Sequence, residues 1–433
     1  FASGFNMRDM LHNIPRIDPT SDEIKIIGKN GVVVLVNGHR INLDGKDLDM
    51  YLRTLPSENV SKIELVTNPS AEFDAEGNCG VINIILKSKP VGFDGNVHTV
   101  LTQRSHFGAE EGIGLSFSSG NFSVEYKINN SNEKRRQIVQ NTYSYPDYMR
   151  FTTDNTLNRY DILGQNLNSN YQLGDLNLGF FATLNNSRSK AHQMGQMTFN
   201  ADACPSNYSE SNHDKYRLET ISPYVDWKLD SLGKKVTVNY NYIHVIDKIN
   251  QNFDSSTAHN FSNSNNDYSY IVNTLSADLN LPFTWLNFEL GGKYSHFRTN
   301  NVSEFGSRNG FLYKETVTAF YADVNRMFGS FYAKAGLRYE HTNDDGITLE
   351  GLSVSNKYDH WFPFAEISYN PSDNHSFALS YSKRIDRPSM NDMNPTRVFR
   401  NTYTYTEGND RLTPSVMDNL EFNYVFKGNF SFN

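Results

Sequence analysis

From residue 91 onward, the chain alternates apolar and polar residues in segments of about ten residues. In the clearest segment, Leu176, Leu178 and Phe180 occupy alternate positions, with Asn177 and Gly179 between them. Successive side chains of a strand point to opposite faces, so each such segment predicts a strand with one apolar and one polar face. The same alternation occurs at 236–242, 275–281, 331–340 and 420–427.

The charged residues of these segments fall almost entirely on one face. Placing Lys or Arg in lipid at the middle of a bilayer costs about 2–4 kcal/mol, so the charge-free face is the one that suits lipid. The pattern therefore predicts strands that cross a membrane, with lipid on one side and a polar interior on the other.

Short turns alternate with longer polar segments along this part of the chain. The short turns fall at 118–121, 173–175, 230–233, 281–284, 327–329, 370–374 and 426–429. We expect the longer segments to be loops, centred on 131–157, 191–213, 251–266, 299–310, 343–357 and 387–414. Outer-membrane barrels have short periplasmic turns and longer extracellular loops, so this asymmetry indicates the same architecture.

Aromatic residues gather beside the short turns, as in the girdle at a membrane interface. They are Trp227, Phe331, Tyr369, Phe377, Phe426 and Phe430. The pattern predicts about fifteen strands, the last beginning at Phe430. Bacterial single-chain barrels have an even number of strands, so we expect further strands after residue 433. Export needs a signal peptide, which this sequence does not show, so we also expect the protein to begin before residue 1.

Residues 1–90 have a different pattern, which predicts a compact α+β unit. A short helix is expected at 7–13, and a second begins after the N-cap Asp44 and ends before Pro56. One face of the second helix is apolar and comprises Leu48, Tyr51, Leu52 and Leu55. Buried strands are expected at 32–36, 63–67 and 81–86.

Composition narrows the class of protein. The 433 residues carry a formal net charge of −8, which excludes the basic surface of a nucleic-acid-binding protein. A mean hydropathy of −0.58 would suit a soluble protein, but two-faced strands keep this average low in membrane barrels. The sequence has no apolar run of about 18 residues, so no transmembrane helix is predicted. Its two cysteines, Cys79 and Cys204, are too few for a disulfide scaffold and are expected to be unpaired.

Three stretches of the N-terminal unit resemble a known family. They are Gly-Val-Val-Val-Leu-Val-Asn-Gly-His at 31–39, Asn-Pro-Ser-Ala-Glu-Phe-Asp-Ala-Glu-Gly-Asn at 68–78, and Gly-Val-Ile-Asn-Ile-Ile-Leu at 80–86. Together they resemble the plug domain of TonB-dependent receptors, most closely the outer-membrane β-barrel family of Bacteroidetes. The later part adds Tyr-Ser-Lys-Arg-Ile-Asp-Arg-Pro at 381–388, Met-Asn-Pro at 393–395 and Glu-Gly-Asn at 407–409. The first helix also resembles the family's plug helix, but that helix usually ends Pro-Gly, so Arg16 is a departure.

Pattern and resemblance together imply a mainly β fold, with a large transmembrane antiparallel up-and-down β-barrel and a small α+β plug in its lumen. A complete barrel of this class has about 22 strands, of which about 15 are covered here. We expect an N-terminally incomplete plug at 1–90 and a C-terminally incomplete barrel at 91–433. The resemblance implies an outer-membrane receptor that imports a scarce extracellular solute into the periplasm.

The resemblance also implies partners. They are outer-membrane lipid and the inner-membrane TonB–ExbB–ExbD complex, reached through an N-terminal segment not present in this sequence. Related glycan importers also have a surface lipoprotein that caps the barrel, and the sequence leaves that partner open. No nucleic acid and no cofactor are expected.

Ligand contacts are expected on the long loops and in the upper lumen. Arg and Tyr suit anionic or sugar-like solutes, through bidentate hydrogen bonds and stacking. The candidates are Arg384, Arg387, Arg397, Arg400, Tyr403 and Tyr405 in and before 387–414, and Tyr143, Tyr145 and Tyr148 in an earlier loop. Exposed loops often carry these residue types without binding a ligand, so the alternative for each candidate is an ordinary loop residue.

The plug motif supplies a second set of candidates: Asn37, Gly38, Asn68, Pro69, Asp74, Gly77, Asn78 and Gly80. Those between 68 and 77 could block the lumen or touch a ligand. The alternative, which we favour, is that Pro, Asp and Gly form a tight structural turn here.

No catalytic residue is identified, because the sequence lacks Gly-x-Ser-x-Gly, His-Glu-x-x-His and a phosphate-binding glycine loop. The segment 343–346 lacks the later ligands of a calcium loop and is predicted to be a turn, so no metal site is expected. Two alternatives to a transporter remain. An uncoupled barrel could serve as an adhesin or surface-binding protein, which a TonB box upstream would argue against. A soluble β-sandwich or propeller would be all-β as well, but no propeller repeats occur.

Overall fold

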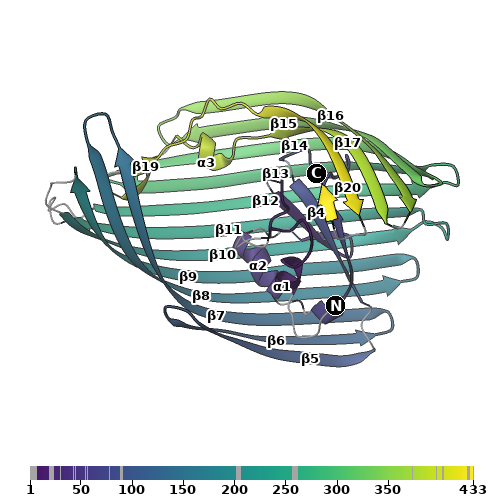
Figure 1. The fold of residues 1–433 in the computed structure, drawn as a ribbon, viewed down its shortest axis with the longest axis horizontal. Helices are drawn as coiled ribbons and strands as arrows, with labels where there is room; N and C mark the ends of the chain where they lie inside the picture. Colours follow the sequence, from purple (N-terminus) through teal and green to yellow (C-terminus); the bar gives the residue numbers. More distant parts are fainter. Residues whose placement is uncertain are drawn as a thin grey trace.

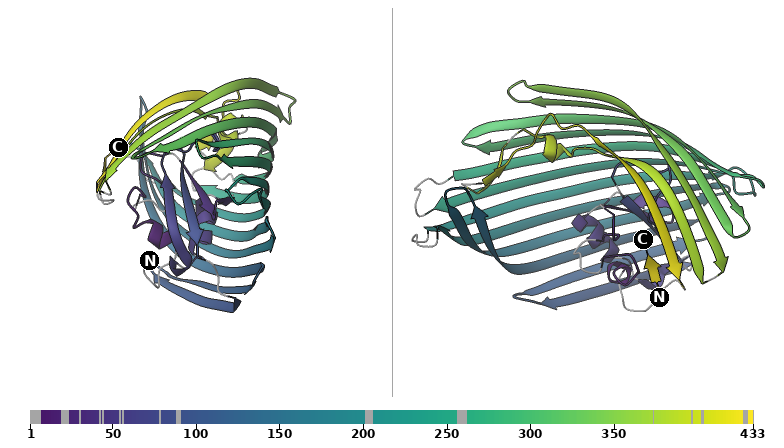
Figure 2. Two further views of the ribbon diagram at one scale, coloured as in Figure 1. Left: turned by 90° about the vertical axis from the view of Figure 1, so that its right-hand side faces the viewer. Right: turned by 45° about the horizontal axis from the view of Figure 1, so that its top comes forward.

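The computed structural model describes residues 7–18, 24–29, 31–41, 43, 45–53, 55, 57–77, 79–87, 91–200, 206–255, 262–372, 374–395, 397–401, 404–426 and 430–432. Two sheets dominate it: a small one within residues 31–86 and a large one that begins at Gly92. The large sheet curls around the small domain, as Figures 1 and 2 show. Among the described residues, no helix is both long and apolar enough to cross a lipid bilayer.

The large sheet has 15 strands, and chain neighbours pair antiparallel throughout. The strands are β5 (Gly92–Gln103), β6 (Phe107–Ser119), β7 (Phe122–Ser144), β8 (Met149–Leu173), β9 (Leu176–Phe199), β10 (Ser206–Lys228), β11 (Lys235–Ser255), β12 (Ser262–Pro282), β13 (Asn287–Phe305), β14 (Ser307–Phe328), β15 (Phe331–Thr348), β16 (Ser353–Ser372), β17 (His375–Asp386), β20 (Ser415–Phe426) and β21 (Phe430–Phe432). The predicted up-and-down topology, strand number and start of the last strand are confirmed. A sandwich or propeller is excluded, because one continuous sheet holds all these strands.

The predicted long loops are mostly wrong. β7 and β8 pair without a break from Phe122 opposite Tyr171 to Ser144 opposite Met149, straight through the expected loop at 131–157. The described parts of 191–213 and 251–266 are likewise almost entirely strand, and so are nearly all of 299–310 and most of 343–357. Backbone pairing with the neighbouring strand is sufficient to continue a strand into water, where neither face must be apolar. The alternation of apolar and polar residues in the sequence therefore identifies only the part of a strand that faces lipid.

Segment 387–414 is the exception and does form a long connection. Between β17 and β20 it contains the short helix α3 (Met390–Met393) and a separate hairpin of β18 (Val398–Asn401) and β19 (Thr404–Thr406). The short turns at the other end are confirmed where they are described. Gly120, Gly174 and Gly329 adopt positive φ there, a conformation that glycine reaches without steric penalty.

The small domain is built on a four-stranded sheet in the order β2-β1-β4-β3. Its strands are β1 (Gly31–Val36), β2 (His39–Ile41), β3 (Val60–Val66) and β4 (Cys79–Leu86), and its helices are α1 (Met7–Leu11), α2 (Gly45–Arg53) and the 3₁₀ turn η1 (Ser57–Asn59). β1 and β4 are parallel, whereas the outer pairs are antiparallel. The three expected strands are confirmed, and β2 was not predicted. Asp44 and Pro56, the expected ends of the second helix, lie outside the described residues.

The core of this domain lies between its sheet and its helices. Val34, Val36, Ile82 and Ile84 pack there against α1 and α2, and each is at most 6% exposed. The predicted apolar face of the second helix is buried as well, at 0–5% exposure for Leu48, Tyr51, Leu52 and Leu55. Gly80 belongs to this packing, because a Cβ at that position would lie 2.5 Å from Cδ1 of Ile26.

The β1–β2 turn is formed by Asn37 and Gly38, with φ values of 52° and 84°. Such a pair at positive φ is typical of a two-residue hairpin. Two hydrogen bonds tie the turn to β4: Oδ1 of Asn37 accepts from the amide of Leu86 at 2.9 Å, and the amide of Gly38 donates to Oδ1 of Asn83 at 3.0 Å. The expectation of a turn at Asn37-Gly38 is confirmed.

The small domain sits inside the curved sheet as a plug and touches the wall with several of its faces (Figure 2). Its core continues into the wall at Phe181, Leu218 and Val245, with the rings of Tyr51 and Phe181 edge to face at 5.5 Å. On another side, Lys29 pairs with Glu421 of β20. The segment between β3 and β4 makes the most extensive polar contact.

Candidate functional site

Residues 68–77, which we call the clasp segment, leave the plug after β3 and dock on the inner wall of the barrel. Ile385 of β17 forms a parallel bridge with Glu76. The amide of Gly77 donates to the carbonyl of Ile385 at 2.8 Å, and the amide of Ile385 donates to the carbonyl of Ala75 at 3.0 Å. The clasp segment therefore extends the wall by one short parallel pairing.

Wall side chains also hold the clasp backbone. The guanidinium of Arg384 donates to the carbonyls of Pro69 and Asp74, the latter at 3.0 Å. The side chain of Asn68 lies between two wall hydroxyls, donating to Ser380 at 2.7 Å and accepting from Ser382 at 3.0 Å. Asn68 is only 6% exposed, so these bonds replace the water that it would otherwise bind.

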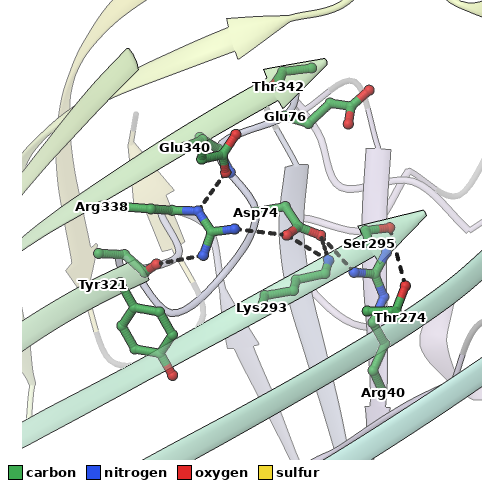
Figure 3. Close-up of polar contacts among 12 residues, drawn as sticks. Arg40, Asp74, Glu76, Thr274, Lys293, Ser295, Tyr321, Arg338, Glu340 and Thr342 are labelled. Atoms are coloured by element: carbon green, nitrogen blue, oxygen red, sulfur yellow. Dashed lines mark hydrogen bonds and ion pairs between the residues drawn. The ribbon is translucent and has the colours of Figure 1, made fainter. Parts of the chain in front are cut away.

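Asp74 is the ionic centre of the contact (Figure 3). Its carboxylate lies 2.6 Å from Nζ of Lys293 on β13, 3.2 Å from Nη2 of Arg338 on β15, and 3.0 Å from Nη1 of Arg40 on β2. Burial opposes ionisation of Asp74, but Lys293, Arg40 and Arg338 outweigh it and hold its pKa well below the usual range. Asp74 therefore joins plug to wall as a carboxylate.

A buried charge network in the wall supports this centre. Nε of Arg338 lies 2.5 Å from Oε1 of Glu340, and Oε2 of Glu340 accepts from Arg387 at 2.6 Å. The side chains of Arg338 and Glu340 are 1% and 2% exposed. Arg387 also pairs with Glu76 of the clasp at 3.4 Å. Arg338, Glu340 and Arg387 remain paired with one another if the clasp leaves, which limits the penalty for releasing it.

The clasp unites the two sequence motifs that were noted separately. Asn68, Pro69, Asp74 and Gly77 come from the plug motif, and Arg384 and Arg387 come from the 381–388 stretch of the barrel. Neither interpretation of 68–77, as a lumen block or as a simple turn, included this docking. Lys293, Arg338 and Glu340 were not among the residues predicted from the sequence, where their only signal was a charge on the polar face of a strand.

The remaining ligand candidates lie elsewhere. Arg397 stands over the ring of Tyr405 at 4.7 Å and pairs with Glu407 at 3.1 Å, on the connection between β17 and β20. At the β7–β8 tip, Cζ of Arg150 lies 4.2 Å from the centre of the Tyr143 ring, and Tyr145 stacks on Tyr148 at 4.5 Å. Tyr403, Asn78 and the side chain of Arg400 lie outside the described residues. No observation tests these residues as ligand contacts, so that role stays a prediction.

A cavity of about 820 Å³ lies between the plug and the wall. The clasp borders it through Asp74 and Glu76, and strands β10 to β15 form most of its outer side. Within the described ranges, no group of three His, Cys, Asp or Glu residues is placed to hold a metal ion.

Comparison with known proteins agrees with this architecture. Residues 227–433 match the model of the outer membrane protein beta-barrel family. No curated protein sequence matches the chain. The family match and the fold show a multi-strand β-barrel of the outer membrane.

Three solved structures are similar in fold. The alcaligin outer membrane receptor FauA from Bordetella pertussis is 12% identical, with a TM-score of 0.56 over 99% of this chain and 66% of that chain. The siderophore receptor PiuA from Acinetobacter baumannii is 14% identical, with a TM-score of 0.53 over 90% and 62%. The copper transporter OprC is 10% identical, with a TM-score of 0.59 over 92% and 62%. The chain thus spans 62–66% of the length of these proteins.

Proposed function

We propose that this outer-membrane barrel is a TonB-dependent receptor that imports an extracellular solute and has no catalytic activity. The observation that carries the proposal is the clasp: a plug segment held to the inner wall by polar and ionic contacts that water can replace. Similarity in fold to receptors and a transporter supports it. A Bacteroidetes origin, the TonB complex and a surface lipoprotein stay predictions.

The clasp contacts suit a gate that opens without unfolding the plug. They combine hydrogen bonds and ion pairs with small apolar contacts, in which Ala75 packs against Ile385 and Phe362 and Ala71 lies beside Gly336. The plug's own core lies on the other side of its sheet, between Val34 and the helices. Release of the clasp would therefore leave this core intact, and each freed polar group could be hydrated.

Covalent closure of the clasp tests the proposal. Glu76 and Ile385 are partners in the parallel bridge, so their Cα atoms lie side by side, and a disulfide spans about 4.4–6.8 Å between Cα atoms. The full-length protein would carry Glu76→Cys and Ile385→Cys, with Cys79→Ser and Cys204→Ser. A matched control would join two wall strands through Asn158→Cys and Ala191→Cys, which are also register partners.

The solute is first identified by comparing growth of a gene-deletion strain with its parent on sole sources of iron, carbon and vitamins. We expect uptake of that solute to require the inner-membrane TonB complex. Uptake should stop when the clasp disulfide is oxidised, return on reduction, and be unaffected by the control disulfide. Equal uptake by the oxidised and reduced clasp would refute gating by this segment. A barrel that lost only surface adhesion on deletion would instead be an uncoupled binding protein.

A further inference from the structure

The cavity of about 820 Å³ between the plug and the wall has an organised lining that the clasp does not explain. Its size falls in the range of cavities that hold drug-sized ligands, about 300–1,000 Å³. We propose that this cavity is a solute-binding site for an uncharged molecule with one apolar face and one hydroxyl- or amide-bearing face. Its place in import rests on the proposed function, but binding itself does not.

The part of the plug side that is formed by the centres of β1 and β4 is apolar. Side chains alternate along β1, so Val34 and Val36 point into the plug core, at 1% and 6% exposure. Val33 and Leu35 point the other way, are half-buried, and line the cavity. Val81 of the neighbouring strand β4 lines it as well. A solute with an apolar face would remove Val33 and Leu35 from water.

The wall opposite carries uncharged polar groups on three adjacent strands. They are Thr237, Asn239, Asn241, Thr274, Ser276 and Ser295. Their mutual hydrogen bonds are long: 3.3 Å between Thr274 and Ser295, and 3.4 Å from Asn239 to Ser276. A hydroxyl accepts twice and donates once, so these groups retain capacity for a solute.

Ser222 on β10 gives an independent sign of an absent partner. It lines the cavity and is 7% exposed, yet its hydroxyl has no hydrogen-bond partner in the described part of the chain. A buried polar group without a partner costs about 1–3 kcal/mol. A solute hydroxyl or amide at this position would supply the absent bond.

The charges of the lining favour an uncharged solute over an anion. Eight Asp or Glu and four Lys or Arg side chains line the cavity, a formal excess of four negative charges. The cations are largely engaged: Lys293 and Arg40 with Asp74, Arg387 with Glu340, and Lys235 with Asp226 at 2.7 Å. Bringing an anion beside unpaired carboxylates is unfavourable, whereas a neutral polar molecule meets no such opposition.

Cys79 provides a direct readout, because it lines the cavity and is half-buried. The full-length protein with Cys204→Ser would be purified in detergent and treated with methyl methanethiosulfonate at alkaline pH. The rate of Cys79 modification is measured in the presence of phenyl β-glucoside or phenyl β-glucuronide. These two probes share a frame and differ in charge, being neutral and anionic.

We expect the neutral probe to protect Cys79 at concentrations at least about tenfold below those that the anionic probe requires. Ser222→Ala with Thr274→Val should weaken that protection about tenfold or more, because two hydrogen bonds are lost. Thr198→Val on β9, which does not line the cavity, should leave it unchanged. Protection by the anionic probe at equal or lower concentration, absence of protection by the neutral probe, or unchanged protection in the double variant would overturn the proposal. Because the assay needs no energy source, these outcomes do not depend on whether the protein transports.

Discussion

Asp74→Asn should release the clasp segment while the plug stays folded. Asparagine keeps the size of the side chain and one oxygen but removes the charge that Lys293, Arg338 and Arg40 share. Removing one member of a buried ion pair costs about 3–5 kcal/mol, and an exposed pair contributes about 1 kcal/mol or less. The Asp74 side chain is 30% exposed, which places it between these limits at about 2 kcal/mol.

At about 1.4 kcal/mol per factor of ten, this loss raises the population of the released clasp about 30-fold. Hydrogen exchange measures that population directly, because the amides of Gly77 and Ile385 bond across the contact. We expect both amides to exchange about 30-fold faster in Asp74→Asn, and those of β4 to be unchanged. The exposed carboxylate of Asp94 on β5 gives a matched control, Asp94→Asn, with no expected effect. Unaltered exchange at Gly77, or equal acceleration throughout the plug, would refute the reasoning.

Two further predictions concern the plug. Gly80→Ala should destabilise it by about 1–3 kcal/mol, because the added Cβ would lie 2.5 Å from Ile26 and 3.2 Å from the carbonyl of Val66. Faster hydrogen exchange of the β4 amides would show this loss, and exchange as slow as in the wild-type protein would contradict it. Burial, followed by the nearby Asp278 and Glu289, raises the pKa of Glu72 to about 7. A raised carboxyl pKa favours the docked state at low pH and loses that contribution as pH rises through 7, so clasp exchange, corrected for its intrinsic rate, should increase from pH 6 to pH 8. Glu72→Gln should remove that increase, and an unchanged pH response in this variant would assign it to another group.

Much of the fold could be predicted because its determinants are local. Alternation between Leu176 and Phe180 requires only that side chains two residues apart share a strand face. The turn at Asn37-Gly38 and the apolar face of Leu48 to Leu55 likewise depend on neighbours in sequence. The extension of β7 and β8 to their tip was missed because strands that leave the membrane continue through backbone pairing, which side-chain polarity does not report.

The candidate site was less predictable, because its partners are remote in sequence. Asp74 and Arg338 are separated by 264 residues, and Pro69 and Arg384 by 315. Arg384 and Arg387 were selected for a solute, whereas the structure places them against the clasp. A guanidinium that suits a solute carboxylate also suits a backbone carbonyl or Glu76, and residue type does not distinguish them.

The sequence by itself thus determined a two-faced membrane sheet, its short turns, its approximate strand number and a plug with its core. Each of these depends on periodicity, turn chemistry or the avoidance of charge in lipid, which act over a few residues. The tertiary structure alone decided that the clasp meets β13, β15 and β17, and that a cavity separates β1 from the opposite wall. Those contacts depend on how the sheet curls and where the plug rests inside it, and both follow from packing summed over the whole molecule.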